Sequence, residues 1–231
     1  MKPMTLGNVL ITGGASGLGA ATVKAVARHG GTPLVIDRQH IDDDVAFECA
    51  DLADTAAVDA AVRALAERAD GRIDGVFTAA GIDSCGKLDE VAVKDWERVI
   101  HVNLLGTAAV IRSALPYLRE SGGRIVTCAS TLGIKAVSDA TAYCASKFGV
   151  VGFSRALAAE LAGEVGVTTL IPGGMHTPFF DGRTEQYKPP PDAKLNQPED
   201  VAETVVFALT QPAGCEVREL VICASTESSW P

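Results

Sequence analysis

The stretch Val9-Leu10-Ile11-Thr12-Gly13-Gly14-Ala15-Ser16-Gly17-Leu18-Gly19 predicts how this chain folds. An apolar, β-branched run ends in a glycine cluster, and an Ala-rich stretch with helical period follows at residues 20–29. Glycines at 13, 17 and 19 permit a tight turn and let the backbone approach a pyrophosphate at the helix N-terminus. A glycine cluster alone is weak evidence, but its place between a strand and a helix favours a dinucleotide site.

The rest of the chain repeats this alternation of strand and helix. Short apolar runs lie at residues 9–12, 34–37, 45–49, 75–78, 124–128, 167–171 and 219–223. Stretches with helical period lie between them at 20–29, 55–69, 93–118 and 141–161. Such alternation predicts an α/β fold with a parallel sheet covered on both faces. We therefore expect one Rossmann-like, doubly wound domain of about seven strands over residues 1–231.

The least regular segment runs from Gly173 to Pro198. Its five prolines exclude a continuous helix or a central strand: Pro178, Pro189, Pro190, Pro191 and Pro198. A loop of this length in a compact domain is usually a lid or a binding loop. We expect a substrate-binding loop at about 174–197.

Composition narrows the function classes. The 231 residues are 47% apolar, which suffices for one full core, and no run reaches the ~18 apolar residues of a membrane span. Met1-Lys2-Pro3-Met4 leads into a short apolar run that ends in a glycine turn, unlike a signal peptide, so we expect a cytoplasmic protein. The net charge of -9 without a basic stripe argues against nucleic acid, and neither nucleic acid nor a membrane is an expected partner.

The six cysteines form no C-x-x-C pair and no cluster with histidine. We expect reduced thiols that mostly pack in the core, and no metal site. Cys128 and Cys144 flank the candidate active residues, but packing is favoured over chemistry for both.

The second strand ends in Asp37, 18 residues after Gly19. This is close to the ~20 residues at which an acidic side chain binds the adenosine ribose hydroxyls. Its carboxylate would repel a 2′-phosphate, and Arg38 is the one nearby cation. We therefore expect NAD as the cofactor and NADP as the less favoured one. The alternative is that Asp37 only caps a turn or helix.

Tyr143 and Lys147 are four residues apart in T-A-Y-C-A-S-K, and Ser130 lies upstream. Positions i and i+4 share one helix face. A lysine cation beside a phenol favours the phenolate and lowers a pKa that is ordinarily ~10. Tyr143 could then take a proton from an alcohol, while the Ser130 hydroxyl holds the same oxygen. A core aromatic beside a solvated lysine is the alternative for an isolated Y-x-x-x-K.

Taken together, these motifs resemble the short-chain dehydrogenase/reductase family in its single-domain form. The resemblance covers nearly the whole chain. It includes T-G-G-A-S-G-L-G, Asp37, Asp51-Leu52, Ala79-Ala80-Gly81, Asn103 in H-V-N-L-L-G, Ser130, Tyr143, Lys147, and Pro172-Gly173 with Thr177. Each motif is weak alone, but their order and spacing together are specific.

The resemblance implies further roles. Asp51 would bind the adenine amino group, Leu52 would line its pocket, and Thr177 would hold the nicotinamide carboxamide. Asn103 would hold a water that links Lys147 to solvent, or satisfy backbone groups at a helix kink. The implied cofactor site comprises Gly13, Ser16, Gly17, Leu18, Gly19, Asp37, Arg38, Asp51, Leu52, Ala79, Ala80, Gly81, Tyr143, Lys147, Pro172, Gly173, Met175 and Thr177.

Two segments depart from the family pattern. Thr78-Ala79-Ala80-Gly81 replaces the usual Asn-Asn-Ala-Gly, which puts some bracing hydrogen bonds in doubt. After the last strand, residues 224–231 replace the usual Asp-Gly-Gly. This tail could pack on a neighbouring subunit, edge the pocket, or be disordered.

The reading that follows is an NAD-dependent oxidoreductase that transfers a hydride between nicotinamide and a secondary alcohol or ketone. Candidate substrate-pocket residues are Leu132, Lys135, His176, Phe179 and Phe180. The cations of the loops hint at a carboxylate or another polar substrate, although solvated charges are the favoured interpretation. The Ala- and Leu-rich stretches at 93–118 and 141–161 suit the buried helical contact of a homo-oligomer, a tetramer or a dimer.

Two other classes remain open. A non-catalytic nucleotide sensor of the same fold would be expected to lack Ser130, Tyr143 or Lys147. A sugar-nucleotide epimerase or dehydratase shares Y-x-x-x-K but usually carries a larger C-terminal substrate domain.

Overall fold

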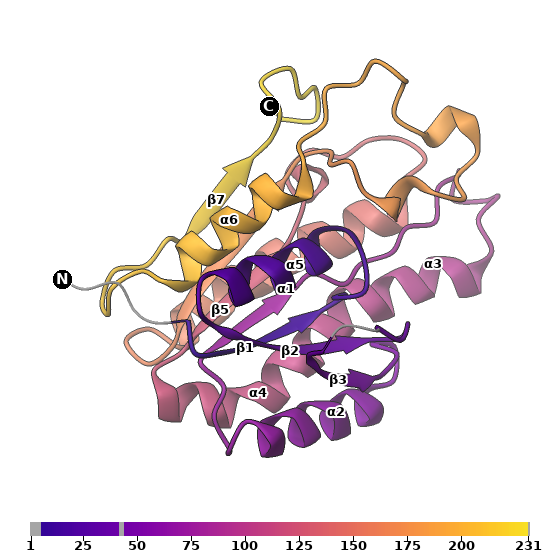
Figure 1. The fold of residues 1–231 in the computed structure, drawn as a ribbon. Helices are drawn as coiled ribbons and strands as arrows, with labels where there is room; N and C mark the ends of the chain where they lie inside the picture. The colour runs from indigo at the N-terminus through magenta and orange to yellow at the C-terminus, as the bar shows by residue number, and fades with distance from the viewer. Residues whose placement is uncertain (1–5, 42–43, 231) are drawn as a thin grey trace.

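In residues 6–41 and 44–230, which the computed structural model describes, seven parallel strands form one sheet in the order β3-β2-β1-β4-β5-β6-β7 (Figure 1). The Met1-Lys2-Pro3-Met4 segment lies outside these ranges. The strands are β1 Asn8–Thr12, β2 Thr32–Asp37, β3 Ala46–Cys49, β4 Gly75–Thr78, β5 Arg124–Cys128, β6 Gly166–Pro172 and β7 Glu219–Ile222. The predicted α/β, doubly wound fold is confirmed.

Helices cover both faces of the sheet. Helices α1 (Gly17–Arg28) and α6 (Pro198–Leu209) pack on one face, while α2 (Thr55–Arg68), α4 (Thr107–Ser121) and α5 (Thr141–Glu160) pack on the other. Strand β1 shows why both faces bury apolar surface, because Val9 and Ile11 join the α1/α6 core and Leu10 joins the opposite core. The central strands, such as β1, β4 and β5, are buried on both faces, which explains why their sequences are nearly continuous apolar runs.

The predicted helix at 93–118 is interrupted. It comprises α3 (Val93–Ile100), a π-helical segment η1 (His101–Gly106) and α4. Asn103 lies within η1, where its side chain bonds the backbone of Ile82 in both directions. Single π turns of this kind widen a helix locally and are frequent at functional sites.

Helix α6 was not predicted, because Pro198 was read as the end of the irregular loop. In the structure Pro198 is the first residue of α6. A proline suits that position, since its fixed φ matches the helix and its missing N–H would have no partner there.

Residues Val93–Ser121 are long and apolar enough to cross a membrane by length and composition, with a hydropathy of 1.3. The α4 part of this stretch, however, places Val110, Ile111, Ala114 and Leu118 in the core beside the sheet. We therefore interpret it as a core helix.

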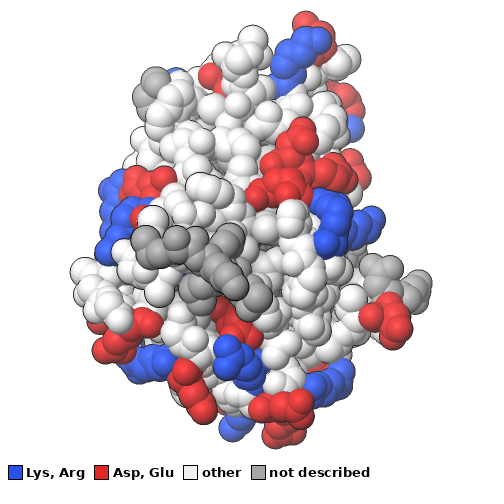
Figure 2. All heavy atoms as spheres, turned by 60° about the vertical axis from the view of Figure 1, so that its left-hand side comes forward, with Lys and Arg blue, Asp and Glu red and all other residues white. Residues whose placement is uncertain are grey.

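The surface carries charges of both signs. On the face in Figure 2, Lys and Arg side chains alternate with Asp and Glu side chains. The described residues on this face therefore form no continuous basic stripe.

Candidate active site

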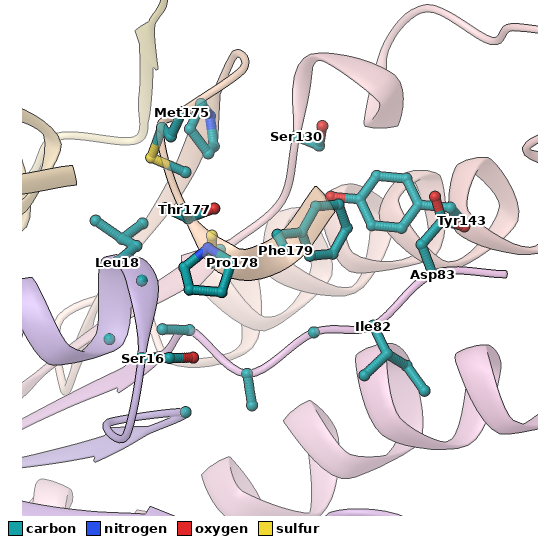
Figure 3. A pocket seen from close by; sticks show the side chains of 18 of the residues that line it. Ser16, Leu18, Ile82, Asp83, Ser130, Tyr143, Met175, Thr177, Pro178 and Phe179 are labelled. Carbon is teal, nitrogen blue, oxygen red and sulfur yellow. The ribbon is translucent and has the colours of Figure 1, made fainter. Parts of the chain in front are cut away.

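The site lies where the strand order reverses between β1 and β4. Parallel sheets bind ligands outside the carboxyl ends of their strands at such a point. A cavity of about 800 Å³ opens here, and it extends from the end of β2 to the start of α5. Every residue expected to bind the cofactor lines this cavity, together with Ser130, Leu132, Phe179 and Phe180. Figure 3 shows Ser16 and Leu18 at one end and Ser130 and Tyr143 at the other.

The glycine turn joins β1 to α1 at the floor of the cavity. A Cβ on Gly19 would collide with the carbonyl oxygen of Gly13, so the turn can close this tightly only with glycine. Ser16 is the N-cap of α1, yet its side chain caps no backbone amide, and the first turn holds no acidic residue. The N-terminus of α1 therefore suits a pyrophosphate, because its amides and positive dipole end attract anions.

Asp37 ends β2 with both carboxylate oxygens bonded to backbone. One oxygen accepts from the Ala15 amide at 3.0 Å and the other from the Gln39 amide at 2.9 Å. These bonds orient the carboxylate at the cavity edge and leave lone pairs for further donors. The capping role and the expected ribose role are therefore compatible.

Asp51 is held in a similar way. It accepts from the Ala53 amide at 3.0 Å and from the Arg98 guanidinium at 2.7 Å, and these bonds hold the pKa of Asp51 below its ordinary value. Arg98 lines the same end of the cavity but was not predicted. In the sequence, only its position on the predicted helix could have indicated this role, because it lies four residues before Val102, which also lines the cavity.

The Thr78-Ala79-Ala80-Gly81 departure has a local effect. The hydroxyl of Thr12 on β1 accepts from the Ala80 amide at 3.2 Å, which braces the two strand ends. The Thr78 hydroxyl is buried and has no hydrogen-bond partner within the described chain. The sequence thus lacks one bracing interaction at this position, while the cavity wall itself is retained.

Ser130, Tyr143 and Lys147 meet at the far end of the cavity. Ser130 precedes the short helix η2 (Thr131–Gly133), and its hydroxyl accepts from the Leu132 amide at 3.1 Å. Tyr143 and Lys147 lie on one face of α5, with the Lys147 ammonium 5.6 Å from the Tyr143 ring centre. The ammonium is buried and donates to the Cys128 carbonyl at 2.8 Å.

The pKa of Tyr143 differs from the expectation. Burial raises the pKa of Tyr143 above its ordinary value, and hydrogen bonding with Ser130 offsets this only in part. Burial also lowers the pKa of Lys147. In the chain without a bound ligand, burial of the phenol therefore opposes the lowering of the Tyr143 pKa that the sequence suggests.

Asn103 does not line the cavity. Its Oδ1 accepts from the Ile82 amide and its Nδ2 donates to the Ile82 carbonyl, both at 2.8 Å, and Nδ2 also donates to Ser146 at 3.0 Å. These bonds fix the chain after β4 and give Asn103 the bracing role at a helix irregularity. The proton-relay role stays a prediction.

The loop after β6 covers the catalytic end. The Phe179 ring lies 5.5 Å from the Tyr143 ring and turns toward the site (Figure 3). The Phe180 ring lies 5.5 Å from the Phe179 ring, and Phe180 also lines the cavity. The Arg183 guanidinium stacks on both phenylalanine rings at 4.7 and 4.8 Å. It also donates to Asp83 at 2.9 Å, and both members of this ion pair are largely buried.

Two candidate substrate residues lie elsewhere. Lys135 is exposed and donates to the Ser228 carbonyl of the tail at 2.9 Å, and neither Lys135 nor the exposed His176 lines the cavity. Among the residues that line it are Asp83, Glu227 and Ser229, which were not named in advance, and Arg183, one of the cations of the predicted loop. Asp83 follows the Ala79-Ala80-Gly81 motif closely, which was a usable signal. Glu227 and Ser229 belong to the C-terminal segment for which edging the pocket was one of three predicted possibilities.

The expectation that the cysteines mostly pack in the core is wrong, because only Cys128 and Cys144 are buried, while Cys85 and Cys223 are half-buried and Cys49 and Cys215 are exposed. All six lie in the described part of the chain, and each is a free thiol. Burial raises the pKa of the Cys128 thiol, which disfavours the reactive thiolate beside Lys147.

Comparison with known proteins agrees with this geometry. The family model described as short chain dehydrogenase matches residues 7–188. The chain is 35% identical over 225 residues to a (2S)-[(R)-hydroxy(phenyl)methyl]succinyl-CoA dehydrogenase subunit of Thauera aromatica, covering 89% of this chain and 90% of the relative. It is 34% identical to D-threitol dehydrogenase of Mycolicibacterium smegmatis, and the match covers 88% of this chain and 86% of the relative.

A solved structure is also similar over nearly the whole length. The crystal structure of levodione reductase matches with a TM-score of 0.83 at 29% identity, covering 95% of this chain and 97% of that chain. The chain belongs to the short-chain dehydrogenase family and is an oxidoreductase of alcohols and ketones with a nicotinamide cofactor.

Proposed function

We propose that this protein uses NAD to interconvert a secondary alcohol and its ketone, with Tyr143 as the proton-transfer residue. The observation that carries the proposal is the position of Tyr143, Lys147 and Ser130 at one end of a cavity whose other end suits a dinucleotide. When bound, the nicotinamide supplies the hydride acceptor or donor.

Each side chain has a separate task in this proposal. The Ser130 hydroxyl holds the substrate oxygen. Tyr143 removes the hydroxyl proton during oxidation or donates a proton to the forming alkoxide during reduction. Lys147 provides a buried positive charge beside the phenol and donates to the nicotinamide ribose. The neutral phenol favoured by burial is the form needed for proton donation to a ketone.

NAD should bind more tightly than NADP by about tenfold or more, a difference of ~1.4 kcal/mol. The reason is that the Asp37 carboxylate, oriented by two backbone amides, would face a 2′-phosphate. Asp37→Ala should reduce the difference in affinity between NAD and NADP. Glu48→Gln, a change outside the cavity, should leave this difference unchanged. Titration of both cofactors tests this. Tighter NADP binding by the unaltered protein would instead make Arg38 a phosphate ligand.

The preferred substrate should be uncharged. Arg183 is paired with Asp83, Lys135 with the Ser228 carbonyl and Lys188 with Glu185 at 2.5 Å. These cations therefore have protein partners, which weakens the hint of a carboxylate substrate. The likeness to D-threitol dehydrogenase supports including neutral polyols among the candidates.

We propose that residues 174–197 form a lid latched by the Arg183–Asp83 pair. Hydrogen bonds of charged groups contribute about 1.5–3 kcal/mol, so Arg183→Gln should speed amide exchange in the lid by roughly tenfold or more. NADH with a substrate analogue should slow exchange in the unaltered lid, because closure excludes water from the reaction. Lys188→Gln, which removes an exposed pair of the same loop, is the matched control. Equal exchange in Arg183→Gln and the unaltered protein would support a static, proline-stiffened loop.

We also propose a homo-oligomer, most simply a tetramer. Leu105 on η1 and Phe148 on α5 are large apolar side chains left 46% and 44% exposed on the segments expected to form the contact. Light scattering should give a multiple of 24.0 kDa, and Phe148→Asp should reduce it, while Lys24→Asp on α1 should not. A monomer at micromolar concentration would contradict this proposal. A cytoplasmic location is part of the same proposal, supported by the six free thiols.

The deciding experiment is a panel of secondary alcohols, diols, polyols and the corresponding ketones, followed through NADH absorbance in both directions. Turnover of neutral members that is lost in Tyr143→Phe would support the proposal. Cofactor binding without turnover of any member would favour the nucleotide-sensor alternative.

A further inference from the structure

The chain after β7 folds back against the active site. Residues 224–230, here called the tail, lie beside the loop that follows β6 (Figure 1). Ser225, Thr226, Ser228 and Trp230 are exposed, whereas Glu227 and Ser229 are half-buried and line the cavity. The tail thus presents two polar side chains to the site.

Glu227 contacts the base of the lid. Its Oε2 accepts from the Gly174 amide at 2.9 Å. A Cβ on Gly173 would stand 2.6 Å from the same oxygen, so the carboxylate reaches the backbone only because this position is glycine. Gly174 also joins the two ends of the lid segment, because its carbonyl accepts a hydrogen bond from the Asn196 amide at 3.1 Å.

The same carboxylate also reaches the segment that follows β5, through Ser229. Its Oε1 accepts from the Ser229 amide at 3.0 Å and from the Ser229 hydroxyl at 2.8 Å. The Ser229 hydroxyl also lies 2.6 Å from the hydroxyl of Thr131, a buried residue that directly follows Ser130. A continuous chain of hydrogen bonds therefore joins Gly174, Glu227, Ser229 and Thr131.

The ionised form of Glu227 maintains this chain. Burial acts to raise the pKa of Glu227, but the amides of Gly174 and Ser229 and the Ser229 hydroxyl outweigh it and hold the pKa below its ordinary value. Both oxygens of the Glu227 carboxylate accept hydrogen bonds. A glutamine at this position could not accept all of them, because its amide NH₂ would face one of the N–H or O–H donors.

We propose that Glu227 is a positioning residue that ties the base of the lid to the segment carrying Ser130, so that the tail sets the width of the substrate end of the cavity. Substrate orientation depends on both walls, since misplacement by a fraction of an ångström lowers the rate of reaction. This inference rests on the proposed function only in placing the substrate against Ser130.

Hydrogen exchange of the full chain tests the connection without requiring turnover. In Glu227→Gln, peptides covering residues 174–177 and 131–134 should both exchange faster, although they lie far apart in sequence. Ser229→Ala keeps the bond to Gly174, so it should affect mainly residues 131–134. Glu219→Gln, which removes an exposed pair with Arg155, should affect neither. Unchanged exchange at 131–134 in Glu227→Gln would overturn the proposal.

Steady-state kinetics provides the second readout. With the best alcohol of the panel, Glu227→Gln should raise KM about tenfold, as expected for loss of a bond to a charged group, with a smaller change in kcat. NADH affinity and Tm should stay close to those of the unaltered protein. A purely structural role would lower Tm and leave KM unchanged, which would overturn the proposal. If the unaltered protein turned over no alcohol, the proposed function would fail while the exchange experiment still decided the role of Glu227.

Discussion

Tyr143→Phe should lower the rate of alcohol oxidation by about 10²–10⁴, the range contributed by a positioned acid–base group. The substitution keeps the ring that packs 5.5 Å from Phe179 and removes only the hydroxyl that exchanges the proton. Cofactor affinity and Tm should therefore change little. Initial rates at saturating NAD, together with an NADH titration, measure the two effects separately.

Tyr117→Phe is the matched control for this substitution. Tyr117 lies on α4, packs against the core and does not line the cavity, so its change should leave turnover intact. Substantial oxidation of the true substrate by Tyr143→Phe would contradict the dehydrogenase mechanism, because that mechanism assigns the proton transfer to the Tyr143 hydroxyl.

Lys147→Ala should damage turnover and cofactor binding together. The buried ammonium lies 5.6 Å from the Tyr143 ring centre and would also hold the nicotinamide ribose. We expect a loss of turnover of about 10²–10⁴. NAD affinity should fall roughly tenfold, in line with loss of a hydrogen bond from a charged group. Calorimetric titration and initial rates measure the two losses.

Lys94→Ala provides the comparison for this change. Lys94 is exposed on α3 and lies away from the cavity, so neither binding nor turnover should change. If Lys147→Ala lowered turnover but bound NAD normally, the ribose contact would have to be abandoned and only the effect on Tyr143 would remain.

Local patterns were sufficient for the fold. Apolar runs ending in Thr12, Asp37 and Cys128 predicted strands buried on both faces, and the observed strand ends agree at these residues. Such strands are recognisable because each successive side chain faces a core, as Val9, Leu10 and Ile11 do. Helix α6 escaped because its initial proline belongs equally well to a loop.

The sequence also predicted residues that together line the end of the cavity next to the glycine turn. Gly13, Gly17, Gly19 and Asp37 occupy a turn and a strand end whose geometry follows from short spacings within one β-α-β unit. Likewise, one helix carries Tyr143 and Lys147, so their relative placement is set by helical period alone. What spacing could not give is the pKa of Tyr143, because burial depends on Phe179 and the loop that carries it.

The substrate end was decided by tertiary structure. Asp83 and Arg183 are a hundred residues apart, and Glu227 reaches Gly174 across fifty-three, so neither pairing has a local signature. Lys135 was expected in the pocket, but its ammonium donates to the Ser228 carbonyl of the tail. The sequence does not show this partner, because it depends on which distant carbonyl the fold brings near the flexible lysine side chain. By itself the sequence determined the sheet, the dinucleotide crevice and the Tyr143–Lys147 pair. The residues that form the glycine turn and the pair are close together in the sequence, so local structure alone brings them together. Only the folded chain decided what closes the cavity, because the lid, the Asp83 segment and the tail meet there through contacts between distant parts of the chain.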